Sequence, residues 1–476
     1  MATRREFVTT LGLYAGAAVG WRAAGLDLGA WVPRDPVPAA TDCCTSVTSF
    51  GAVGDGETDC TTAVQAALDA NPSGTVYFPP GRYRTRARLR IPSNVRITGQ
   101  GAVILPELPA DAAWAEIVGA SNIVFDGLEV EGAHQGITIG SGASRIVFHR
   151  CTFRSLPSGT LQQVIWLFDC SDIQVLNCRF QATGYGVIVQ AGHRADNVLV
   201  SGNYFEDMRN DAVEQNSESV TCHRWVIANN IVDTVGVPGG GIFALGFGIT
   251  RTENLVIVGN SLYNTHGLAS IHIENAVNFL VTGNYIERHH GGFGGIYLVS
   301  EPTSGNVVGN TIKDCEIGIT GNLNGWAPEI AIRSNYIYCE SFVGNVAMDL
   351  RLTNRVAVSD NLIRNYRIGI QLFANRDCSF QSNTIYGAAT EDSQGIVAAG
   401  PGELHRVVVQ NNHIVGTGRE GILLHGLRES VVSQNVVSGC GSGGRTAGLS
   451  LRGAGNHVEG NVALGAAGEI GGLSIH

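Results

Sequence analysis

Apolar and polar residues alternate in short runs along this chain, and many of these runs close on an Asn that is followed, two residues later, by an apolar residue. Residues 278–286 (NFLVTGNYI), which close on Asn284, are a typical example. The closing residue recurs as Asn177, Asn203, Asn230, Asn260, Asn284, Asn310, Asn335, Asn361, Asn383, Asn412, Asn435 and Asn461. The mean spacing is about 26 residues, a period that indicates a solenoid.

A second short alternating run lies between successive closing Asn residues. It reads GYGVIVQ at 184–190, GGIYLVS at 294–300, IGIQLFA at 368–374 and EGILLHG at 420–426. Alternation in a strand sends one set of side chains inward and the other outward. One coil cannot bury its apolar set alone, so the coils must stack. The pattern therefore predicts an all-β fold, a parallel β-helix of about a dozen coils.

The recurring Asn residues fit a structural role better than a role as ligands. Stacked parallel strands place equivalent residues about 4.8 Å apart, so Asn side chains at one turn position would form a ladder of amide hydrogen bonds. Asn also tolerates the backbone conformations of turns. The alternatives for such a period are a leucine-rich repeat and a propeller, but neither Leu-x-x-Leu nor a Trp-Asp signature recurs.

Composition is compatible with one elongated domain, because a solenoid grows by adding coils and does not enlarge a single core. The chain has 476 residues, of which 44% are hydrophobic, and its 63 glycines lack the three-residue period of collagen. A net charge of −10 disfavours nucleic acid as the main partner.

Cysteine usage does not indicate a metal site. The 11 cysteines are scattered and show no Cys-x-x-Cys spacing. Cys151 and Cys178 are about one coil apart and could stack or pair. We expect most of the cysteines to be small buried apolar residues.

The N-terminus resembles a twin-arginine export signal. Residues 3–8 (TRREFV) precede an apolar stretch at 11–21 that is too short to span a membrane. We expect residues 1–40 to be an export signal and linker, and the mature chain to be secreted or bound at the cell surface, without a membrane span.

A further segment carries a family resemblance. Residues 50–59 (FGAVGDGETD) lead into a helical pattern with Ala63, Val64, Ala67 and Leu68, which is followed by GTVYFPPGRY at 74–83. This segment resembles the N-terminal signature of the pectate-lyase-like β-helix superfamily. The resemblance implies a right-handed β-helix with an N-terminal capping helix. Residues 41–100 are assigned to this cap and the first strands, and residues 101–476 to the parallel β-helix repeats. It loosely implies carbohydrate substrates but no particular reaction, because lyases, hydrolases, epimerases and phage tailspikes share this fold.

An arginine at every second position follows this signature: Arg82, Arg84, Arg86, Arg88 and Arg90. In one strand this spacing places all five on one face, with Tyr83, Thr85, Ala87 and Leu89 on the other. Such a row suits a polyanion. The alternative, slightly favoured, is a solvated face that protects an edge strand.

Candidate chemistry emerges when the second strand of each coil is aligned and the outward position between two inward apolar residues is compared. In consecutive coils this position holds Ile188, Glu214, Phe243, His272, Tyr297, Thr320, Asp349 and Gln371. Toward the C-terminus the same position holds residues without titratable or aromatic groups: Val397, Leu423, Ser450 and Ser474. Aromatic rings that face sugars, together with carboxylates or an imidazole for proton transfer, are typical of a sugar-binding groove.

Titratable neighbours extend this stripe. Asp211 lies in the turn before Glu214, Glu274 follows His272 by two residues, and Arg351 follows Asp349 by two. The candidate catalytic residues are therefore Glu214, His272, Tyr297, Asp211 and Glu274. The candidate substrate-binding residues are Phe243, Asp349, Arg351 and Gln371.

The first mechanism that these residues allow is β-elimination or C5 epimerisation of a uronate-containing polysaccharide, with His272 and Tyr297 as base and acid. Arg351, or an ion such as Ca²⁺ held by Asp211 and Glu214, would neutralise the substrate carboxylate. The sequence itself requires no cofactor. We rank this mechanism first at this stage.

Two alternatives stay open. In a glycoside hydrolase or transglycosidase, Glu214 would act with Asp211 or Glu274 as a carboxyl pair. In a non-catalytic, tailspike-like or adhesive binding protein, the strand at residues 472–476 would offer an uncapped end for a homo-oligomer.

Overall fold

The computed structural model describes residues 44–465 except 110, 133–134, 156–161, 218, 237–244, 324–328, 399, 401 and 442–447. The predicted export signal, the strand at 472–476, Ser474 and Phe243 lie outside the described residues. No helix among the described residues is long and apolar enough to cross a membrane.

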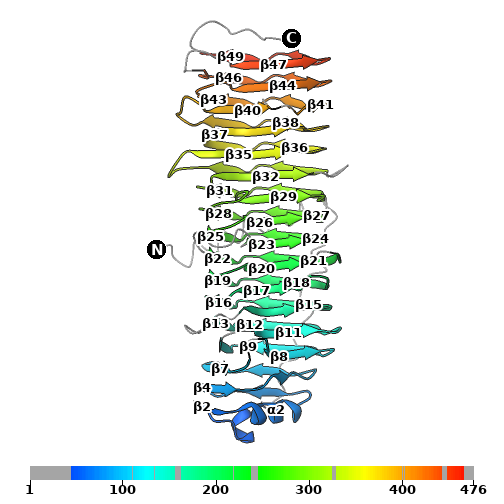
Figure 1. Ribbon diagram of the computed structural model, residues 1–476, viewed down its shortest axis with the longest axis vertical. Helices are drawn as coiled ribbons and strands as arrows, with labels where there is room; N and C mark the ends of the chain where they lie inside the picture. Colours follow the sequence, from blue (N-terminus) through cyan, green and yellow to red (C-terminus); the bar gives the residue numbers. More distant parts are fainter. Residues whose placement is uncertain are drawn as a thin grey trace. The chain divides into compact units, whose positions relative to one another are not determined.

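Most coils of the described residues contribute one strand to each of three faces, as the strands β26 (Ala269–Glu274), β27 (Val277–Thr282) and β28 (Tyr285–Glu287) illustrate. We call the faces that hold β26, β27 and β28 face 1, face 2 and face 3. Each strand pairs in parallel with its equivalents in neighbouring coils, so the coils stack in chain order (Figure 1). The predicted parallel β-helix is confirmed.

The strands of face 1, besides β26, are β5 (Leu89–Arg90), β8 (Ala113–Val118), β11 (Gln135–Gly140), β14 (Gln163–Leu167), β17 (Tyr185–Val189), β20 (Val213–Asn216), β23 (Leu245–Thr250), β29 (Ile296–Ser300), β32 (Ile317–Leu323), β35 (Gly344–Arg351), β40 (Gln394–Ala398), β44 (Ile422–Arg428) and β47 (Leu449–Ala454). The C-terminal half of the long strand β37 (Leu362–Phe373) also belongs to face 1, between β35 and β40. The short strand β41 (Leu404–His405) pairs with the C-terminal part of β44.

The strands of face 2, besides β27, are β1 (Cys44–Ser46), β3 (Thr75–Tyr77), β6 (Arg96–Thr98), β9 (Ser121–Asp126), β12 (Ser144–His149), β15 (Cys170–Leu176), β18 (Ala195–Ser201), β21 (Cys222–Ala228), β24 (Thr252–Val258), β30 (Thr303–Val308), β33 (Ile330–Arg333), β36 (Val356–Ser359), β38 (Ser379–Gln381), β42 (Val408–Gln410), β45 (Val431–Ser433) and β48 (His457–Glu459).

The strands of face 3, besides β28, are β2 (Asp55–Asp59), β4 (Gly81–Thr85), β7 (Ala102–Pro106), β10 (Glu129–Gly132), β13 (Thr152–Ser155), β16 (Arg179–Gln181), β19 (Tyr204–Met208), β22 (Ile231–Val235), β25 (Ser261–Thr265), β31 (Thr311–Lys313), β34 (Tyr336–Tyr338), β37 (Leu362–Phe373), β39 (Thr384–Gly387), β43 (His413–Val415), β46 (Val436–Ser438) and β49 (Val462–Leu464).

The sequence underestimated the number of coils. Face 2 alone forms a 17-stranded sheet, and the solenoid has about 15 turns instead of a dozen. The missed coils precede Asn177, where the closing residue of the strand is not Asn and the pattern could not be recognised.

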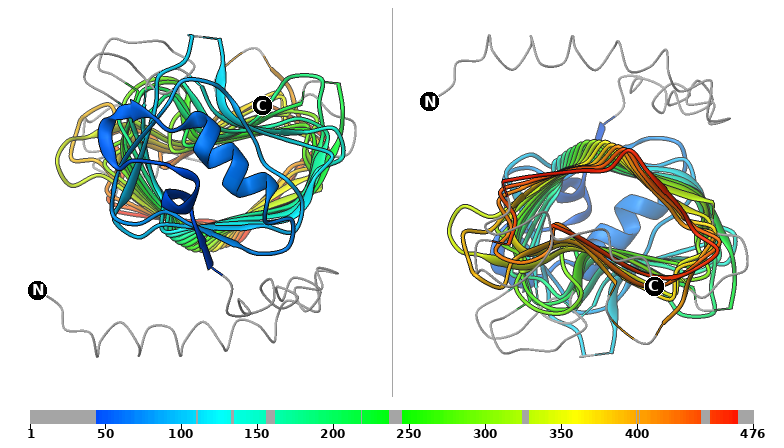
Figure 2. Two further views of the ribbon diagram at one scale, coloured as in Figure 1. Left: turned by 90° about the horizontal axis from the view of Figure 1, so that it is seen from below. Right: turned by 90° about the horizontal axis from the view of Figure 1, so that it is seen from above.

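A continuous apolar core lies between the three faces. The end views show how the stacked strands enclose this interior (Figure 2). Its aromatic residues stack from coil to coil, with ring centroids 4.9 Å apart for Phe125 and Phe148 and 4.7 Å apart for Phe180 and Phe205. The helix α2 (Thr61–Asp69), preceded by the short 3₁₀ helix η4 (Val47–Phe50), lies across the N-terminal end and buries Val64, Ala67 and Leu68. The predicted capping helix is therefore confirmed.

A ladder of asparagine amides runs through the turn between faces 2 and 3. Nδ2 of each residue donates to Oδ1 of the next at 2.8–3.0 Å along the series Asn203, Asn230, Asn260, Asn284, Asn310, Asn335, Asn361, Asn383, Asn412, Asn435 and Asn461. Each Nδ2 also donates to a backbone carbonyl of the preceding coil; for Asn284 this is the Ile257 carbonyl, at 3.0 Å. These bonds satisfy polar groups that are buried away from water.

Asn177 does not belong to the ladder, which corrects the sequence alignment at this coil. Its side chain is exposed, and the residue in register with Asn203 is Cys178, whose backbone N–H donates to Asn203 Oδ1 at 2.8 Å. Cys151 holds the same position one coil earlier, and both thiols are buried and unoxidised. Of the two arrangements expected from the sequence, stacking and pairing, the structure shows stacking.

The arginine row is ion-paired and does not present free cations. Arg82 pairs with Glu131, Arg84 and Arg86 pair with Glu107, and Arg88 and Arg90 pair with Glu116, at 2.8–3.3 Å. The chain also leaves the strand after Thr85, so Ala87 is exposed and the five arginines do not share one strand. The five arginines therefore do not form a row of free cations for a polyanion. The strand β4, with Arg82 and Arg84, pairs with both β2 and β7, whereas β5, with Arg90, pairs only with β8 among the described strands and is an edge strand, as the alternative interpretation expected.

The ladder gives a first prediction. Replacing Asn310 by Ala removes the acceptor of two bonds from Asn284 and the donor to the Val281 carbonyl and Asn335. We expect the free energy of unfolding in denaturant to fall by about 3–5 kcal/mol, because buried polar groups lose their partners. The control is Asn306→Ala in the same coil, where one 3.5 Å bond from Arg333 is lost. Equal unfolding midpoints for the two variants would contradict the role of the ladder.

Candidate functional site

The strand register of face 1 defines one outward column of side chains. Starting at β8 and continuing through β47, it comprises Glu116, Thr138, Trp166, Ile188, Glu214, Gly248, His272, Tyr297, Thr320, Asp349, Gln371, Val397, Leu423 and Ser450. We refer to this set as the outward column. It brings Glu214, His272 and Tyr297 into one row, with Asp349 and Gln371 further along.

Gly248, and not Phe243, stands between Glu214 and His272, which corrects the sequence alignment. The run at 242–249 reads IFALGFGI, and neither of its outward residues on β23, Leu245 and Gly248, is polar, whereas Gly246 faces the core side chain of Leu262. The sequence of this run therefore does not show which of its residues point inward. Only the pairing of β23 with β20 and β26 shows that Gly248 occupies the outward column.

The space above Gly248 is filled by its neighbours. A Cβ atom at this position would lie 2.6 Å from Leu245 Cδ1 and 3.0 Å from Asp211 Oδ2. The carboxyl group of Asp211 thus extends from the turn before β20 to the outward column. Its Oδ1 accepts the backbone N–H of Leu245 at 2.8 Å, and the residue is only 2% exposed.

Asp211 and Glu214 form a buried carboxyl pair. Burial raises the pKa of Glu214 to about 7. Burial, and secondarily the charge of Glu214, raise the pKa of Asp211 well above its usual range. Two carboxyl groups in this position titrate as a unit, and the pair retains a proton near neutral pH.

Tyr185 lies against this pair at the start of β17. Burial raises the pKa of its hydroxyl to about 12, and the charges of Glu214 and Asp211 act in the same direction. One strand earlier, Trp166 holds the outward column and donates from Nε1 to Gln190 Oε1 at 3.1 Å. These aromatic side chains border the acidic pair on the N-terminal side. Sequence analysis missed both, although the aromatic residues in 163–167 and 184–190 are a readable signal.

His272 and Tyr297 form a second group in the outward column. Their rings stack with centroids 5.3 Å apart, and Phe293 stacks on the Tyr297 ring at 4.3 Å. His272 is 8% exposed, its Nε2 has no hydrogen-bond partner among the described residues, and burial lowers its pKa to about 4. The imidazole is therefore neutral at neutral pH and can accept a proton at Nε2.

Glu274 lies next to His272 on the same strand but is more open to solvent. Its Oε1 accepts the Ser300 hydroxyl at 3.1 Å, and its Oε2 is 4.0 Å from His272 Nε2, too far for a hydrogen bond. Glu274 therefore offers a half-buried carboxyl within reach of water.

Asp349 and Arg351 form an ion pair in which Arg351 Nε lies 2.9 Å from both carboxylate oxygens and Nη2 2.7 Å from one of them. Thr320 separates Asp349 from Tyr297 in the outward column, and Gln371 follows Asp349. Asp349, Arg351 and Gln371 therefore lie together, at least three strand spacings from His272. Arg351, which was expected to neutralise the substrate carboxylate beside His272, is instead paired with Asp349. Among the described residues, no group of three or more His, Cys, Asp or Glu side chains is arranged to hold a metal ion.

Comparison with known protein families matches most of the described coils. A family described as "Rhamnogalacturonase A/epimerase, pectate lyase-like" matches residues 44–117. A family described as "Right handed beta helix region" matches residues 112–231 and 339–463, which is just over half of the chain.

Relatives that are named as carbohydrate-active enzymes match only over short segments. The chain is 48% identical over 56 residues to a probable glucan endo-1,3-β-glucosidase of Arthroderma benhamiae, a match that covers 12% of this chain and 6% of the relative. It is 47% identical over 66 residues to a mannuronan C5-epimerase of Azotobacter vinelandii (12% of this chain and 5% of the relative). It is 48% identical over 66 residues to an alginate lyase of the same organism (12% and 8%). The chain thus spans less than a tenth of the length of these relatives.

Solved structures agree in fold at low sequence identity. The catalytic unit of a GH87 α-1,3-glucanase from Streptomyces thermodiastaticus aligns with a TM-score of 0.51 and 17% identity, over 79% of this chain and 70% of that chain. The pre-mature gene product 12 of bacteriophage phi29 aligns with a TM-score of 0.56 and 12% identity, over 88% of this chain and 72% of that chain. The coil architecture, the N-terminal cap and the family matches agree, and the chain belongs to the pectate-lyase-like right-handed β-helix superfamily.

Proposed function

We propose that this protein hydrolyses a glycosidic bond of a polysaccharide and that Glu214 is the general acid. The observation that carries the proposal is the Glu214 carboxyl group, which stands in the outward column and has its pKa raised to about 7 by burial. A carboxylic acid that keeps its proton near neutral pH can protonate the oxygen of a leaving sugar.

In this mechanism Glu214 donates its proton to the glycosidic oxygen while the bond from that oxygen to the anomeric carbon breaks. Glu274 takes a proton from the water that attacks the anomeric carbon. Glu214 and Glu274 lie two strand spacings, about 10 Å, apart along the stack and two positions apart along the strand. Such a separation is wider than the roughly 5 Å between the carboxyl groups of retaining glycosidases, so it favours inversion of configuration over retention.

Asp211 acts on Glu214 as a positioning residue. Its pKa is raised well above the usual range by burial and by the charge of Glu214, so the Asp211 carboxyl keeps its proton and lies as a neutral group beside the acid. Trp166 and Tyr185 offer aromatic faces for neighbouring sugar rings. The short matches with a glucan endo-1,3-β-glucosidase and the similarity in fold to an α-1,3-glucanase support a hydrolase.

A second candidate is β-elimination or C5 epimerisation of a uronate polymer. The unpartnered Nε2 of His272, stacked beside Tyr297, favours it, because a neutral buried imidazole can remove a proton next to a carboxylate. The short matches with a mannuronan C5-epimerase and an alginate lyase agree with this chemistry. It ranks second because Arg351 is held by Asp349, and because the Glu274 carboxylate beside His272 would repel a uronate.

We also infer that the reaction takes place outside the cytoplasm, because residues 3–8 resemble a twin-arginine export signal.

Activity assays on the two polymer types test the assignment. We expect Glu214→Gln to lower the release of reducing ends from a neutral glucan by roughly 10²–10⁴-fold, the usual effect of losing a general acid. The matched control is Glu253→Gln, which removes a carboxyl from face 2. Absorbance of unsaturated uronate that disappears in His272→Ala but persists in Glu214→Gln would instead establish elimination. If neither product forms with wild-type protein, hydrolysis and elimination are both rejected, and C5 epimerisation and binding without catalysis are left.

The raised pKa of Glu214 makes a separate prediction for stability. A carboxyl whose folded-state pKa is raised stabilises the fold below its unfolded pKa, and this contribution is lost as the pH rises through the folded value. Between pH 4 and pH 8, wild-type protein should therefore lose on the order of 3 kcal/mol of unfolding free energy relative to Glu214→Gln. Denaturant titrations at each pH measure this difference, and parallel pH curves would contradict the buried, protonated carboxyl.

A further inference from the structure

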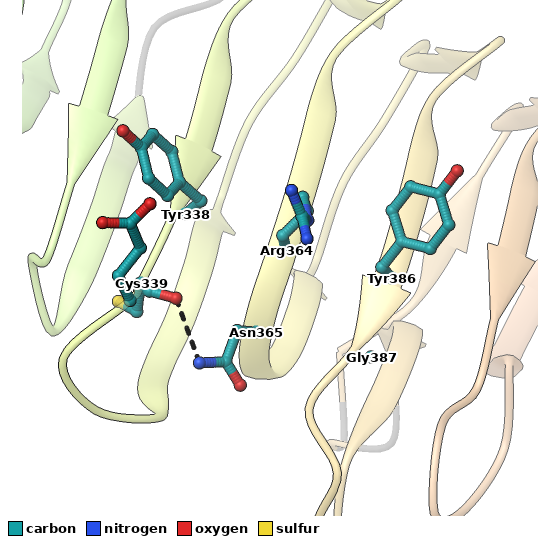
Figure 3. A pocket seen from close by; sticks show the side chains of 7 residues that line it. Tyr338, Cys339, Arg364, Asn365, Tyr386 and Gly387 are labelled. Atoms are coloured by element: carbon teal, nitrogen blue, oxygen red, sulfur yellow. Dashed lines mark hydrogen bonds between the residues drawn. The ribbon is translucent and has the colours of Figure 1, made fainter.

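A second set of side chains with binding chemistry lies on face 3, away from the outward column. In register on β34, β37 and β39 stand Tyr338, Arg364 and Tyr386. Counted along face 3, Tyr338 is four coils beyond the coil of Glu214. All three side chains project from the stack and line a cavity of about 260 Å³ (Figure 3).

The cavity has a fixed base. Asn365 donates from Nδ2 to the carbonyls of Cys339 and Phe342, both at 3.0 Å, which ties the turn after β34 to the next coil. The ring of Tyr338 stacks on that of Tyr336 with centroids 4.2 Å apart and an interplanar angle of 17°. Tyr386 stands at the other end of the cavity and is 42% exposed. A site whose walls are already held in place loses little entropy on binding.

Arg364 sits between the two tyrosines and lacks an acidic partner. Its Nη1 donates to the Tyr336 hydroxyl at 3.3 Å, and no carboxylate of the described residues lies within 4.0 Å of its guanidinium. Other cations of face 3 are paired: Arg179 with Glu206 at 2.6 Å, and Lys313 with Glu340 at 3.1 Å. Glu340 also borders the cavity, but Lys313 already holds its carboxylate.

We propose that this cavity is a binding site for a carboxylate-bearing sugar of an acidic polysaccharide. The guanidinium of Arg364 would bind the sugar carboxylate, since its planar fork of donors matches the two oxygens. The rings of Tyr338 and Tyr386 would pack against the apolar faces of the sugar on either side. No bond is made or broken here, so the site holds a polysaccharide chain on a face other than the one that carries Glu214.

Calorimetric titration of the full chain with oligomers of polygalacturonate tests this proposal. We expect Arg364→Gln to weaken binding by roughly 10-fold or more, because a charge-assisted hydrogen-bond pair is lost. Tyr338→Ala and Tyr386→Ala should also weaken it. The matched control is Arg179→Gln, an arginine of the same face that already has a carboxylate partner, and this variant should bind as wild type does.

A second ligand distinguishes the contribution of the sugar carboxylate from that of the sugar ring. Methyl-esterified polygalacturonate oligomers keep the sugar rings but lose the carboxylates, and we expect them to bind at least 10-fold more weakly than the free acid. Binding of the free acid should also decrease as NaCl is raised, because the Arg364 side chain is exposed.

Several outcomes would overturn the inference: no binding of the free acid to wild type, equal affinities for free and esterified oligomers, or unchanged affinity in Arg364→Gln. Glu214→Gln should bind these oligomers as wild type does, which keeps this test separate from the test of the proposed hydrolysis. If Glu214→Gln lost binding as strongly as Arg364→Gln, the oligomer would be occupying face 1, and the face 3 site would be rejected.

Discussion

The structure depends on one constraint, which is that equivalent residues of successive coils must lie directly above one another. Parallel pairing fixes this register along the backbone, and the asparagine ladder fixes it again at the turn between faces 2 and 3. Each amide between the two ends of the ladder donates twice and accepts twice inside a region closed to water, as Asn310 illustrates. A slip of one residue would leave these groups unpaired and move the inward apolar residues to the surface.

Because the register is fixed, side chains of one kind can be gathered into columns. Inside, the columns are aliphatic residues and stacked phenylalanines. Outside, a column is free to carry chemistry, as the one through Glu214, His272 and Tyr297 does. An outward side chain is nevertheless not necessarily exposed. Leu245, Ala269 and Tyr297 form a small apolar cluster on the outside of face 1, and His272 beside it is nearly buried. This local burial raises the pKa of the carboxyl pair and lowers that of the imidazole.

The two proposed sites differ in charge because their arginines differ in partners. On face 1 the available cation, Arg351, is neutralised by Asp349, and the groups near His272 are acidic. On face 3 Arg364 retains its charge between two tyrosines. Face 1 therefore suits proton transfer to a sugar oxygen, whereas face 3 suits the retention of an anionic chain. A solenoid can separate these tasks because each coil contacts chiefly its neighbours and binding surfaces extend along the stack.

The sequence by itself determined the repeat, the inward and outward alternation, the asparagine ladder and the capping helix, since each depends on short-range pattern and a fixed period. It also identified Glu214, His272 and Tyr297 as members of one row, because each coil has one strand of this kind. The tertiary structure decided what period alone leaves open. The sequence placed Phe243 in the outward column, whereas strand pairing places Gly248 there. A run without polar residues does not show which of its side chains point inward. The sequence placed Asn177 at the ladder position of its coil, whereas strand pairing places Cys178 there, because register is set by pairing and not by residue type. The raised pKa of Asp211 and Glu214, the pairing of the arginine row and the unpaired charge of Arg364 depend on contacts between coils more than 20 residues apart, which sequence spacing does not reveal.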